Sequence, residues 1–361
     1  MEAPLRYGII GTGMMGREHI LNINAIEGTA VTAIADTNEQ SRVEGVAVAG
    51  KGVAVFADHR ELLDPGLVDA VVVATPNMTH VDVLLDVIEA GIPVLVEKPL
   101  CTTVEDCRRV VDAAEERGSL VWVGLEYRYM PPIARLIREV RAGATGTARM
   151  IAIREHRFPF LVKVDNWNRF NRNSGGTLVE KCCHFFDLMN LIAASRPVRV
   201  FASGAQDVNH LDEEYDGERP DILDNAFVIV DYEGGKRALL DLCMFCDVSK
   251  WQEELSVVGD RGKVEAFVPG LYPVPEGGKV RIADREAGTV VDETVTDERI
   301  RFEGLHHGSS YLEHLDFRDA VLAGETPEVS LVDGMLAVAM GVAAHRSIDE
   351  GRAITLDEVL A

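Results

Sequence analysis

Apolar residues follow two different patterns along the chain. In the first third, short apolar runs alternate with longer stretches in which apolar residues recur at helical spacing. This alternation is typical of an α/β Rossmann domain with a doubly wound parallel sheet. We predict its strands at Tyr7–Ile10, Val31–Ala35, Val53–Phe56, Ala70–Ala74, Val94–Val96 and Leu120–Val123.

The pattern changes near residue 125, which divides the chain into a first domain (1–125) and a second domain (126–361). In the second domain a helix, Ile133–Arg141, precedes many strand-like runs with few helices between them. This order indicates an α+β fold with a large open, mainly antiparallel sheet. Two helices, His307–Ala323 and Leu331–Glu350, close the chain, and we expect the C-terminal helix to pack back on the first domain. The predicted strands are Arg149–Glu155, Val198–Ser203, Ala226–Asp231, Arg237–Met244, Glu254–Val258 and Lys263–Ala266.

Composition is that of an ordinary soluble protein, with 47% hydrophobic and 26% charged residues in a length of 361. A net charge of −23 disfavours nucleic acid and anionic membranes as partners. No apolar run approaches the roughly 20 residues of a membrane span, and no signal peptide is evident, so we predict a cytoplasmic protein. The acidic segment 207–224 is expected to be a solvated loop. The six cysteines are few for this length, which favours reduced thiols.

A glycine-rich turn follows the first predicted strand. Gly11, Gly13 and Gly16 have the G-x-G-x-x-G spacing, in which the second glycine lets the backbone approach a pyrophosphate. The N–H groups at the start of the next helix would then hold the anion. The predicted dinucleotide contacts in this turn are Gly11, Thr12, Gly13, Met14, Met15 and Gly16.

The second predicted strand ends in Asp36, about 20 residues after the last glycine, where a dinucleotide site places an acid that binds the adenosine ribose. Neither Thr37 nor Asn38 is an arginine that could hold a 2′-phosphate, and Asp36 would repel one. The sequence therefore predicts NAD, with NADP less favoured, and contacts from Asp36 and Thr37.

Polar residues also follow the later strands, whose carboxyl ends meet at one crevice in such sheets. Lys98 lies between Glu97 and Pro99 directly after a buried strand, so its ammonium could stabilise an alkoxide or relay a proton. A simple ion pair with Glu97 is the alternative. Asn77 and His80 are expected near the nicotinamide ribose, although helix capping also explains Asn77. The further cofactor contacts predicted are Ala74, Thr75, Pro76, Asn77, His80, Glu97 and Lys98.

The second domain contains a histidine flanked by acids. After Gly175-Gly176, Glu180, His184 and Asp187 fall at helical i, i+4 and i+7, so we predict that they share one helix face. A carboxylate one turn from a histidine can orient its ring and raise its basicity. A core histidine is the plainer alternative. No metal site is predicted, because the adjacent cysteines of Lys181-Cys-Cys-His184 would point to different faces and Cys243-Met-Phe-Cys246 has no second pair.

Together these motifs resemble the glucose-fructose oxidoreductase and inositol dehydrogenase (Gfo/Idh/MocA) family of sugar and polyol dehydrogenases. The likeness rests on Gly11-Thr-Gly-Met-Met-Gly16, Ala74-Thr-Pro-Asn77, Glu97-Lys-Pro99, Gly175-Gly176 with His184 and Asp187, and Ser330-Leu-Val-Asp-Gly334.

This resemblance implies a Rossmann domain followed by a substrate domain whose open sheet builds a homodimer or homotetramer. It implies that Lys98 and His184 are the catalytic pair, assisted by Glu180, where the family usually has aspartate. Lys181, which follows, could pair with Glu180. The candidate substrate contacts are Lys98, Tyr127, Arg128, Trp167, Arg169, His184 and His307.

The predicted reaction is NAD-dependent hydride transfer from a secondary ring hydroxyl of a sugar, glycoside or inositol. One alternative is a non-catalytic sugar sensor that binds NAD on the same fold. Another is an enzyme that keeps NAD tightly bound and both oxidises and re-reduces a sugar or glycoside.

Overall fold

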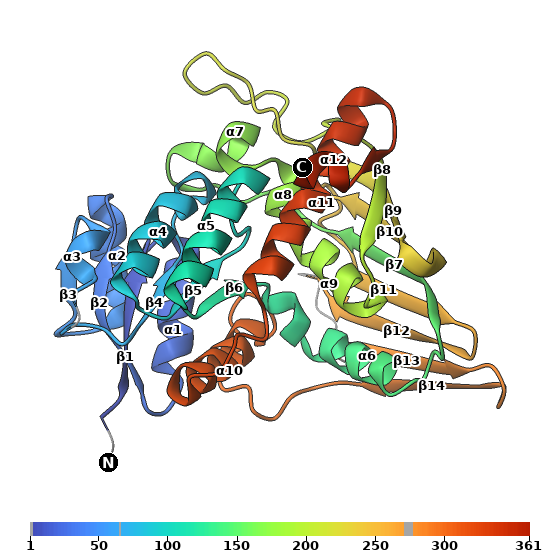
Figure 1. Ribbon diagram of the computed structural model, residues 1–361, viewed down its shortest axis with the longest axis horizontal. Coiled ribbons are helices and arrows are strands. Elements are labelled where there is room, and N and C mark those ends of the chain that lie inside the picture. Colours follow the sequence, from blue (N-terminus) through green and yellow to red (C-terminus); the bar gives the residue numbers. More distant parts are fainter. Residues whose placement is uncertain (1–2, 65, 271–276) are drawn as a thin grey trace.

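The structure is a computed structural model that describes residues 3–64, 66–270 and 277–361. Within these ranges the first domain is a six-stranded, wholly parallel sheet in the order β3-β2-β1-β4-β5-β6 (Figure 1). The strand order reverses between β1 and β4, so the loops after these strands open a ligand site. The strands are β1 (Leu5–Ile10), β2 (Thr29–Ala35), β3 (Ala54–Phe56), β4 (Ala70–Val73), β5 (Val94–Glu97) and β6 (Val121–Gly124).

Helices lie between these strands, as the alternating pattern predicted. They are α1 (Met14–Asn24), α2 (Glu39–Ala49), α3 (His59–Leu62), η1 (Asn77–Thr79), α4 (His80–Ala90) and α5 (Val104–Arg117). Side chains at Thr103 and Asn38 cap α5 and α2, accepting hydrogen bonds from the N–H groups of Asp106 and Ser41.

The second domain is built on a nine-stranded mixed sheet, counted over the described residues, in the order β14-β13-β12-β11-β7-β10-β9-β8-β15. Its strands pair antiparallel except for β7 with β10. The predicted fold class is therefore confirmed. The strands are β7 (Ala148–His156), β8 (Pro197–Ala205), β9 (Asn225–Tyr232), β10 (Arg237–Cys243), β11 (Trp251–Gly259), β12 (Gly262–Pro269), β13 (Lys279–Asp284), β14 (Thr289–Thr294) and β15 (Ile354–Thr355).

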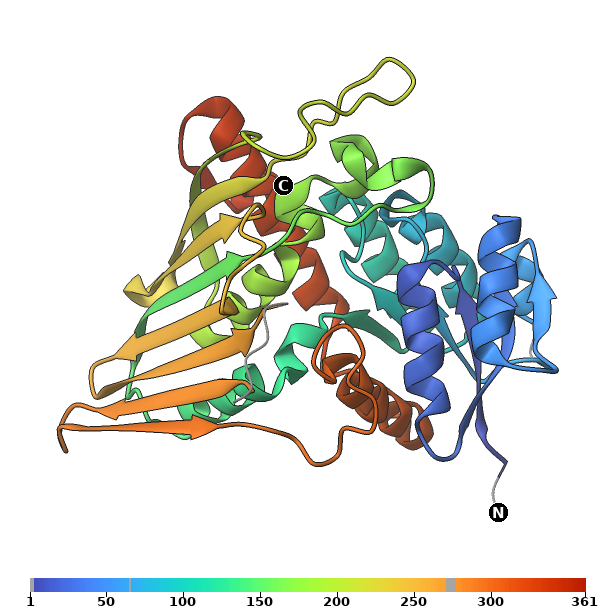
Figure 2. The ribbon, with the colours of Figure 1, turned by 180° about the vertical axis from the view of Figure 1, so that it is seen from behind.

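Helices cover one face of this sheet and leave the other open (Figure 2). Along β9, Ala226, Val228 and Val230 are buried, whereas Phe227 and Ile229 are exposed, as the twofold periodicity of a strand requires. The helices and turns are η2 (Glu126–Tyr129), α6 (Pro131–Arg141), η3 (Val164–Arg169), α7 (Asn171–Ser174), α8 (Thr177–Glu180), α9 (Cys183–Ala193), η4 (Glu233–Gly235), α10 (Ser309–Ala323), α11 (Leu331–Glu350) and α12 (Asp357–Leu360).

Helix α11 lies between the two domains and contacts α5 and β6 on one side and α9 and β8 on the other (Figure 1). A capping box starts it, in which Ser330 and Asp333 each accept a hydrogen bond from the other's N–H group. Contrary to the sequence analysis, α11 is long and apolar enough to cross a membrane by length and composition. Its packing between the domains makes it a core helix.

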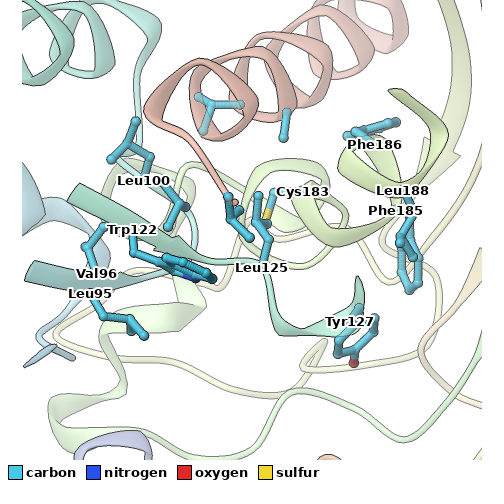
Figure 3. Packing of buried hydrophobic residues seen from close by; sticks show 14 of the residues in the cluster. Leu95, Val96, Leu100, Trp122, Leu125, Tyr127, Cys183, Phe185, Phe186 and Leu188 are labelled. Atoms are coloured by element: carbon cyan, nitrogen blue, oxygen red, sulfur yellow. The ribbon is translucent and has the colours of Figure 1, made fainter. Parts of the chain in front are cut away.

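One hydrophobic core runs through both domains. Figure 3 shows Leu95 and Trp122 from the parallel sheet in the same cluster as Phe185 and Phe186 of α9, with Tyr127 near the domain junction. All five side chains are buried. Because this packing is continuous, residues at the ends of the parallel strands are held against residues of the second domain.

Candidate active site

The glycine turn has the geometry that its spacing predicted. Gly11 has a φ of +90°, and a Cβ on it would lie 2.6 Å from the backbone of Ala74, while a Cβ on Gly16 would lie 1.9 Å from the carbonyl oxygen of Gly11. A Cβ on Gly13 would meet nothing within 4 Å. No side chain caps the start of α1 and no acid lies in its first turn. The turn therefore has no room for a side chain at Gly11 or Gly16, whereas the space beside Gly13 is open. This arrangement fits a pyrophosphate at the helix N-terminus.

The carboxylate of Asp36 is held at the edge of this turn. It accepts hydrogen bonds from the N–H groups of Thr12 (2.7 Å) and Asn38 (2.8 Å). The guanidinium of Arg42 donates to the carbonyl oxygens of Asp36 (2.7 Å) and Thr37 (3.1 Å). The sequence analysis considered only the two residues after Asp36 and so missed Arg42, which the first turn of α2 brings back to the strand end.

Asn77 and His80 connect backbone segments. The Asn77 amide donates to the carbonyl of Ser174 in the second domain (3.1 Å). Both ring nitrogens of His80, which is fully buried, lie within 3.0 Å of backbone carbonyls, those of Pro99 and Thr75. His80 therefore has no free ring nitrogen for a ribose, and it instead joins the loop after β4 to the loop after β5.

The Glu97 carboxylate is paired with a histidine and accepts from the backbone N–H of Lys98 (3.1 Å), but it is not hydrogen-bonded to the Lys98 ammonium. Its Oε1 lies 2.9 Å from Nε2 of His19, whose Nδ1 lies 2.8 Å from Nε2 of His314. Burial opposes ionisation of Glu97, but the hydrogen bond from His19 and the charge of Lys98 outweigh it and lower the pKa of Glu97 to about 2. The charges of Glu97 and Lys98 stabilise each other, but the two side chains form no direct ion pair within 4.0 Å in the described structure, so the simple pair considered from the sequence is not present.

The Lys98 ammonium reaches into the second domain and donates to the carbonyl oxygen of Glu180 (3.2 Å). Burial would lower the pKa of Lys98, but the acidic groups around it, Cys183, Glu97 and Glu180 foremost, raise it. Lys98 therefore remains an ammonium at neutral pH, and two of its N–H bonds have no acceptor among the residues that the structure describes.

The prediction that Glu180, His184 and Asp187 share one helix face is wrong. Helix α8 ends at Glu180, a turn follows at Lys181 and Cys182, and α9 begins at Cys183. The turn directs the Glu180 carbonyl toward Lys98, and Oε2 of its buried carboxyl has no hydrogen-bond partner among the described residues. Burial raises the pKa of Glu180.

His184 is fully enclosed beside Tyr127, with their rings stacked at 4.0 Å and inclined by 8°. Its Nε2 lies 3.8 Å from a carboxyl oxygen of Glu126, and its Nδ1 has no hydrogen-bond partner in the described part of the chain. Burial, with the charges of Lys98 and Lys181, holds the pKa of His184 well below its usual range. The imidazole is therefore neutral at neutral pH, and its Nδ1 is left without a partner in the described structure.

Arg128, a predicted substrate contact, binds Asp187, which was predicted to lie on the helix face of His184. The guanidinium donates to both carboxyl oxygens of Asp187, to the carbonyl of Glu328 (3.1 Å), and lies 3.4 Å from Asp333. These contacts of the buried Arg128 guanidinium link η2, α9 and α11. The structure thus corrects the assignment of Arg128 as a substrate contact, because its donors are used inside the protein.

Lys181 pairs with a residue that the sequence analysis did not single out. Its ammonium lies 2.9 Å from Glu155 of β7 and donates to the Tyr127 hydroxyl (2.5 Å). Glu155 is fully buried opposite Glu253 of β11. Burial and the charge of Glu155 raise the pKa of Glu253 to about 7. Lys181 therefore does not neutralise Glu180; it supports the tyrosine that stacks on His184.

The loop that leads to α7 lies beside this centre. Arg169 is buried, its Nε donates to Glu213 of the acidic loop (2.8 Å), and its Nη1 has no hydrogen-bond partner in residues the structure describes. Trp167 is half-buried. The acidic segment is therefore not wholly a solvated loop, since Glu213 pairs with Arg169 and Asp224 is buried, accepting hydrogen bonds from the N–H groups of Val208 and Asn209.

The neighbouring histidine, and not His307, approaches the centre. His307 is exposed in a left-handed turn with φ 55°. Nδ1 of His306 lies 3.8 Å from Glu126, and its ring is 6.1 Å from that of Tyr127. Burial and the charge of Lys181 lower the pKa of His306 to about 3. The sequence contains no signal that shows which of the two adjacent histidines, His306 or His307, approaches the centre.

A cavity that the structure contains lies away from Lys98 and His184. A cavity of about 620 Å³ lies between α6 and α9, lined by residues that include Val140, Ile192 and Lys236, and neither Lys98 nor His184 lines it. Over the described ranges, no three His, Cys, Asp or Glu side chains gather as a metal site would require. All six cysteines are free.

Known proteins place the chain in a family. A family model described as an oxidoreductase family with an NAD-binding Rossmann fold matches residues 5–125, and the model of its C-terminal alpha/beta domain matches residues 138–356. Myo-inositol 2-dehydrogenase of Thermotoga maritima is 29% identical over 99% of this chain and 100% of its own length. Inositol 2-dehydrogenase 2 of Saccharopolyspora erythraea is 28% identical over 96% of this chain and 94% of its own.

Among solved structures, an oxidoreductase domain protein from Kribbella flavida has the same fold, with a TM-score of 0.84 over 98% of this chain and 100% of its own at 20% identity. The two family models together run from residue 5 to residue 356 with one short gap. The chain therefore belongs to the Gfo/Idh/MocA oxidoreductase family, whose members join an NAD-binding Rossmann fold to a C-terminal alpha/beta domain.

Proposed function

We propose that this protein is an NAD-dependent dehydrogenase that oxidises a secondary ring hydroxyl of a sugar, glycoside or cyclic polyol. One observation carries the proposal: the ammonium of Lys98 and the neutral imidazole of His184, from different domains, converge beside the Glu180 turn. The inositol dehydrogenases among its relatives support the substrate class.

The dinucleotide, when bound, supplies the hydride acceptor. The turn Gly11–Gly16 would hold its pyrophosphate, and the fixed Asp36 carboxylate would hold its adenosine ribose. Asp36 would repel a 2′-phosphate, so NAD is favoured over NADP. The guanidinium of Arg42 lies beside Asp36, but it already donates to the carbonyl oxygens of Asp36 and Thr37.

In the reaction, Nδ1 of His184 accepts the proton of the substrate hydroxyl, because this buried nitrogen has no other partner in the described structure. The two free N–H bonds of Lys98 stabilise the negative charge that develops on the oxygen. Stacking on Tyr127 fixes the plane of the imidazole. Glu180 contributes through its carbonyl, which aligns Lys98, and through a carboxyl open to a substrate hydroxyl.

We further propose that the open sheet face joins copies of this chain. Phe201 of β8, Ile229 of β9 and Leu239 of β10 are cross-strand neighbours in one row, and all are exposed. Exposed apolar side chains in a continuous row mark an interaction surface. The expected assembly is a homodimer or homotetramer.

The test is a screen at 340 nm with NAD or NADP and inositols, aldoses, anhydrosugars and glycosides. We expect one chemical group to reduce NAD. Binding of NADH, followed by its fluorescence, is the companion measurement. Bound NADH with no reduction of NAD by any group would argue against a dehydrogenase that releases its cofactor, and reduction of NADP in preference to NAD would contradict the role of Asp36.

A further inference from the structure

Two histidines approach the same oxygen of Glu126. Oε1 of this carboxyl lies 3.8 Å from Nε2 of His184 and 3.8 Å from Nδ1 of His306. The ring of Tyr127, the next residue in the chain, stacks on His184 at 4.0 Å and lies 6.1 Å from the ring of His306. Hydrogen bonds between catalytic groups are often long before a substrate binds and shorten in its complex. Glu126 is therefore placed between two imidazoles with which it can exchange protons.

These three groups run from the buried site to the surface. The side chains of His184 and Glu126 are exposed by only 2% and 4%, whereas that of His306 is exposed by 24%. Nδ1 of His306 is itself buried, without a hydrogen-bond partner among the described residues, so the exposure belongs to the rest of its side chain. Leu305 and His307 on either side are exposed. One imidazole ring thus joins the interior to solvent.

Backbone hydrogen bonds hold His306 in this place. The N–H of Leu305 donates to the carboxyl of Glu18 on α1 (2.9 Å). The N–H of Ser309, the first residue of α10, donates to the carbonyl of His306 (3.0 Å). Helix α10 in turn packs against η2, which carries Glu126. The distance between His306 and Glu126 is therefore set by the packing of α1, α10 and η2.

Each of the three groups has, at neutral pH, the form that proton transfer along them requires. Burial, with the charge of Glu97, raises the pKa of Glu126 to about 8, so its carboxyl holds a proton. Burial and the charge of Lys181 lower the pKa of His306 to about 3, and His184 is neutral as well. A neutral imidazole donates from one nitrogen and accepts at the other, and a protonated carboxyl oxygen can donate and accept together.

We propose that the proton taken from the substrate leaves the active site through Glu126 and His306. This inference rests on the proposed function, since it gives the exit for the proton of the same reaction. As the O–H bond of the substrate breaks, Nδ1 of His184 gains that proton, and Nε2 of His184 loses one to Oε1 of Glu126.

The remaining steps carry a proton to water. Glu126 passes the proton it already holds to Nδ1 of His306, and Nε2 of His306 releases one to solvent. One proton enters the path and one leaves it, so each of the three groups ends neutral. Exchange with water restores the starting tautomers once the product has left.

The experiment compares Glu126→Gln, His306→Ala and the double variant with the unmodified protein, using the substrate found in the screen. We expect kcat to fall roughly 10-fold in each single variant, with KM changed less than about threefold, because proton departure and not binding is impaired. The double variant should be no slower than the slower single variant, since both changes interrupt one path. The ratio of kcat in water to kcat in heavy water should rise in all three.

Free imidazole should restore the kcat of His306→Ala, whereas 1-methylimidazole, which fills the same space but has no N–H to release, should not. A purely structural role of His306 would not distinguish the two compounds. His59→Ala is the matched control, because it removes a histidine that also pairs with a carboxylate, that of Asp86 (2.8 Å), in the first domain. It should change neither kcat nor the isotope effect.

The same variants are compared without turnover. In protein with isotope-labelled histidine and bound NADH, NMR measures how fast the ring N–H of His184 exchanges with water. We expect this exchange to slow roughly 10-fold in His306→Ala and Glu126→Gln, and to recover in His306→Ala when imidazole is added. That result with no NAD reduction by any sugar would sustain the inference while contradicting the proposed reaction. Unchanged exchange in both variants, an unchanged isotope effect on turnover, or equal rescue by 1-methylimidazole would overturn the inference.

Discussion

Lys98 and His184 show how a shared environment gives two residues opposite protonation states. His184 is buried and Lys98 half-buried. The pKa of Lys98 is raised by the acidic groups around it, whereas burial and the charges of Lys98 and Lys181 lower the pKa of His184. Each therefore has, at neutral pH, the form that an acid–base pair needs.

Lys98→Met is expected to lower kcat by two or more orders of magnitude, because it removes the charge that stabilises the reacting oxygen. Steady-state kinetics with the substrate found in the screen measures this. Fluorescence titration with NADH separates loss of turnover from loss of cofactor binding. Lys51→Met serves as the control at an exposed lysine, and near-normal turnover of Lys98→Met would remove Lys98 from the mechanism.

Glu126 makes stability depend on pH. Burial, with the charge of Glu97, raises the pKa of Glu126 from 4.5 to about 8. Between these values the folded protein holds a proton that the unfolded protein releases, so the free energy of unfolding falls as pH rises from about 4.5 to 8. Glu126→Gln should flatten this fall and, at pH 8, stabilise the protein by on the order of 2 kcal/mol.

Urea denaturation of Glu126→Gln and the unmodified protein at pH 5, 6.5 and 8 measures this effect. Glu115→Gln, at an exposed position of α5, is the control and should leave the pH dependence unchanged. Parallel pH profiles of Glu126→Gln and the unmodified protein would mean that Glu126 is ionised throughout.

At the scale of elements, the break between α8 and α9 matters most for the site. In a continuous helix the Glu180 carbonyl would accept a hydrogen bond from a backbone N–H group of the next turn. The turn at Lys181 and Cys182 instead leaves this carbonyl free to accept from Lys98. Helical spacing alone predicted the continuous helix, because none of these residues is a strong helix breaker.

Helix α11 is the element whose stability should affect both domains together. Ser330→Ala removes half of the capping box and is expected to lower the free energy of unfolding by about 1 kcal/mol. Urea denaturation should show one transition shifted to lower urea. Thr326→Ala, which removes an exposed hydroxyl four residues earlier, is the control. Two separate transitions would show that α11 does not couple the domains.

At the scale of the whole molecule, the nine-stranded sheet has one face toward the core and one toward solvent. Phe227, exposed by 60%, lies on the open face beside the row of Phe201, Ile229 and Leu239. Phe227→Asp should shift the protein from oligomer to monomer, because it puts a charge into an apolar interface. Light scattering after size exclusion measures this, with Val43→Asp on exposed α2 as the control. An unchanged mass for Phe227→Asp would place any interface elsewhere.

The sequence by itself determined the fold class and the outline of the dinucleotide site. Both are local patterns: strand and helix periodicities show which faces are buried, and three glycines with a following acid occupy fixed distances along one βαβ unit. The same local logic identified α11 with its bounds and located Lys98 at a strand end.

Only the tertiary structure decided which charged side chains meet. Arg128 with Asp187, Lys181 with Glu155, and Arg169 with Glu213 are partners separated by at least 26 residues. Such pairs depend on how β7, α9 and the acidic loop pack, which no local pattern encodes.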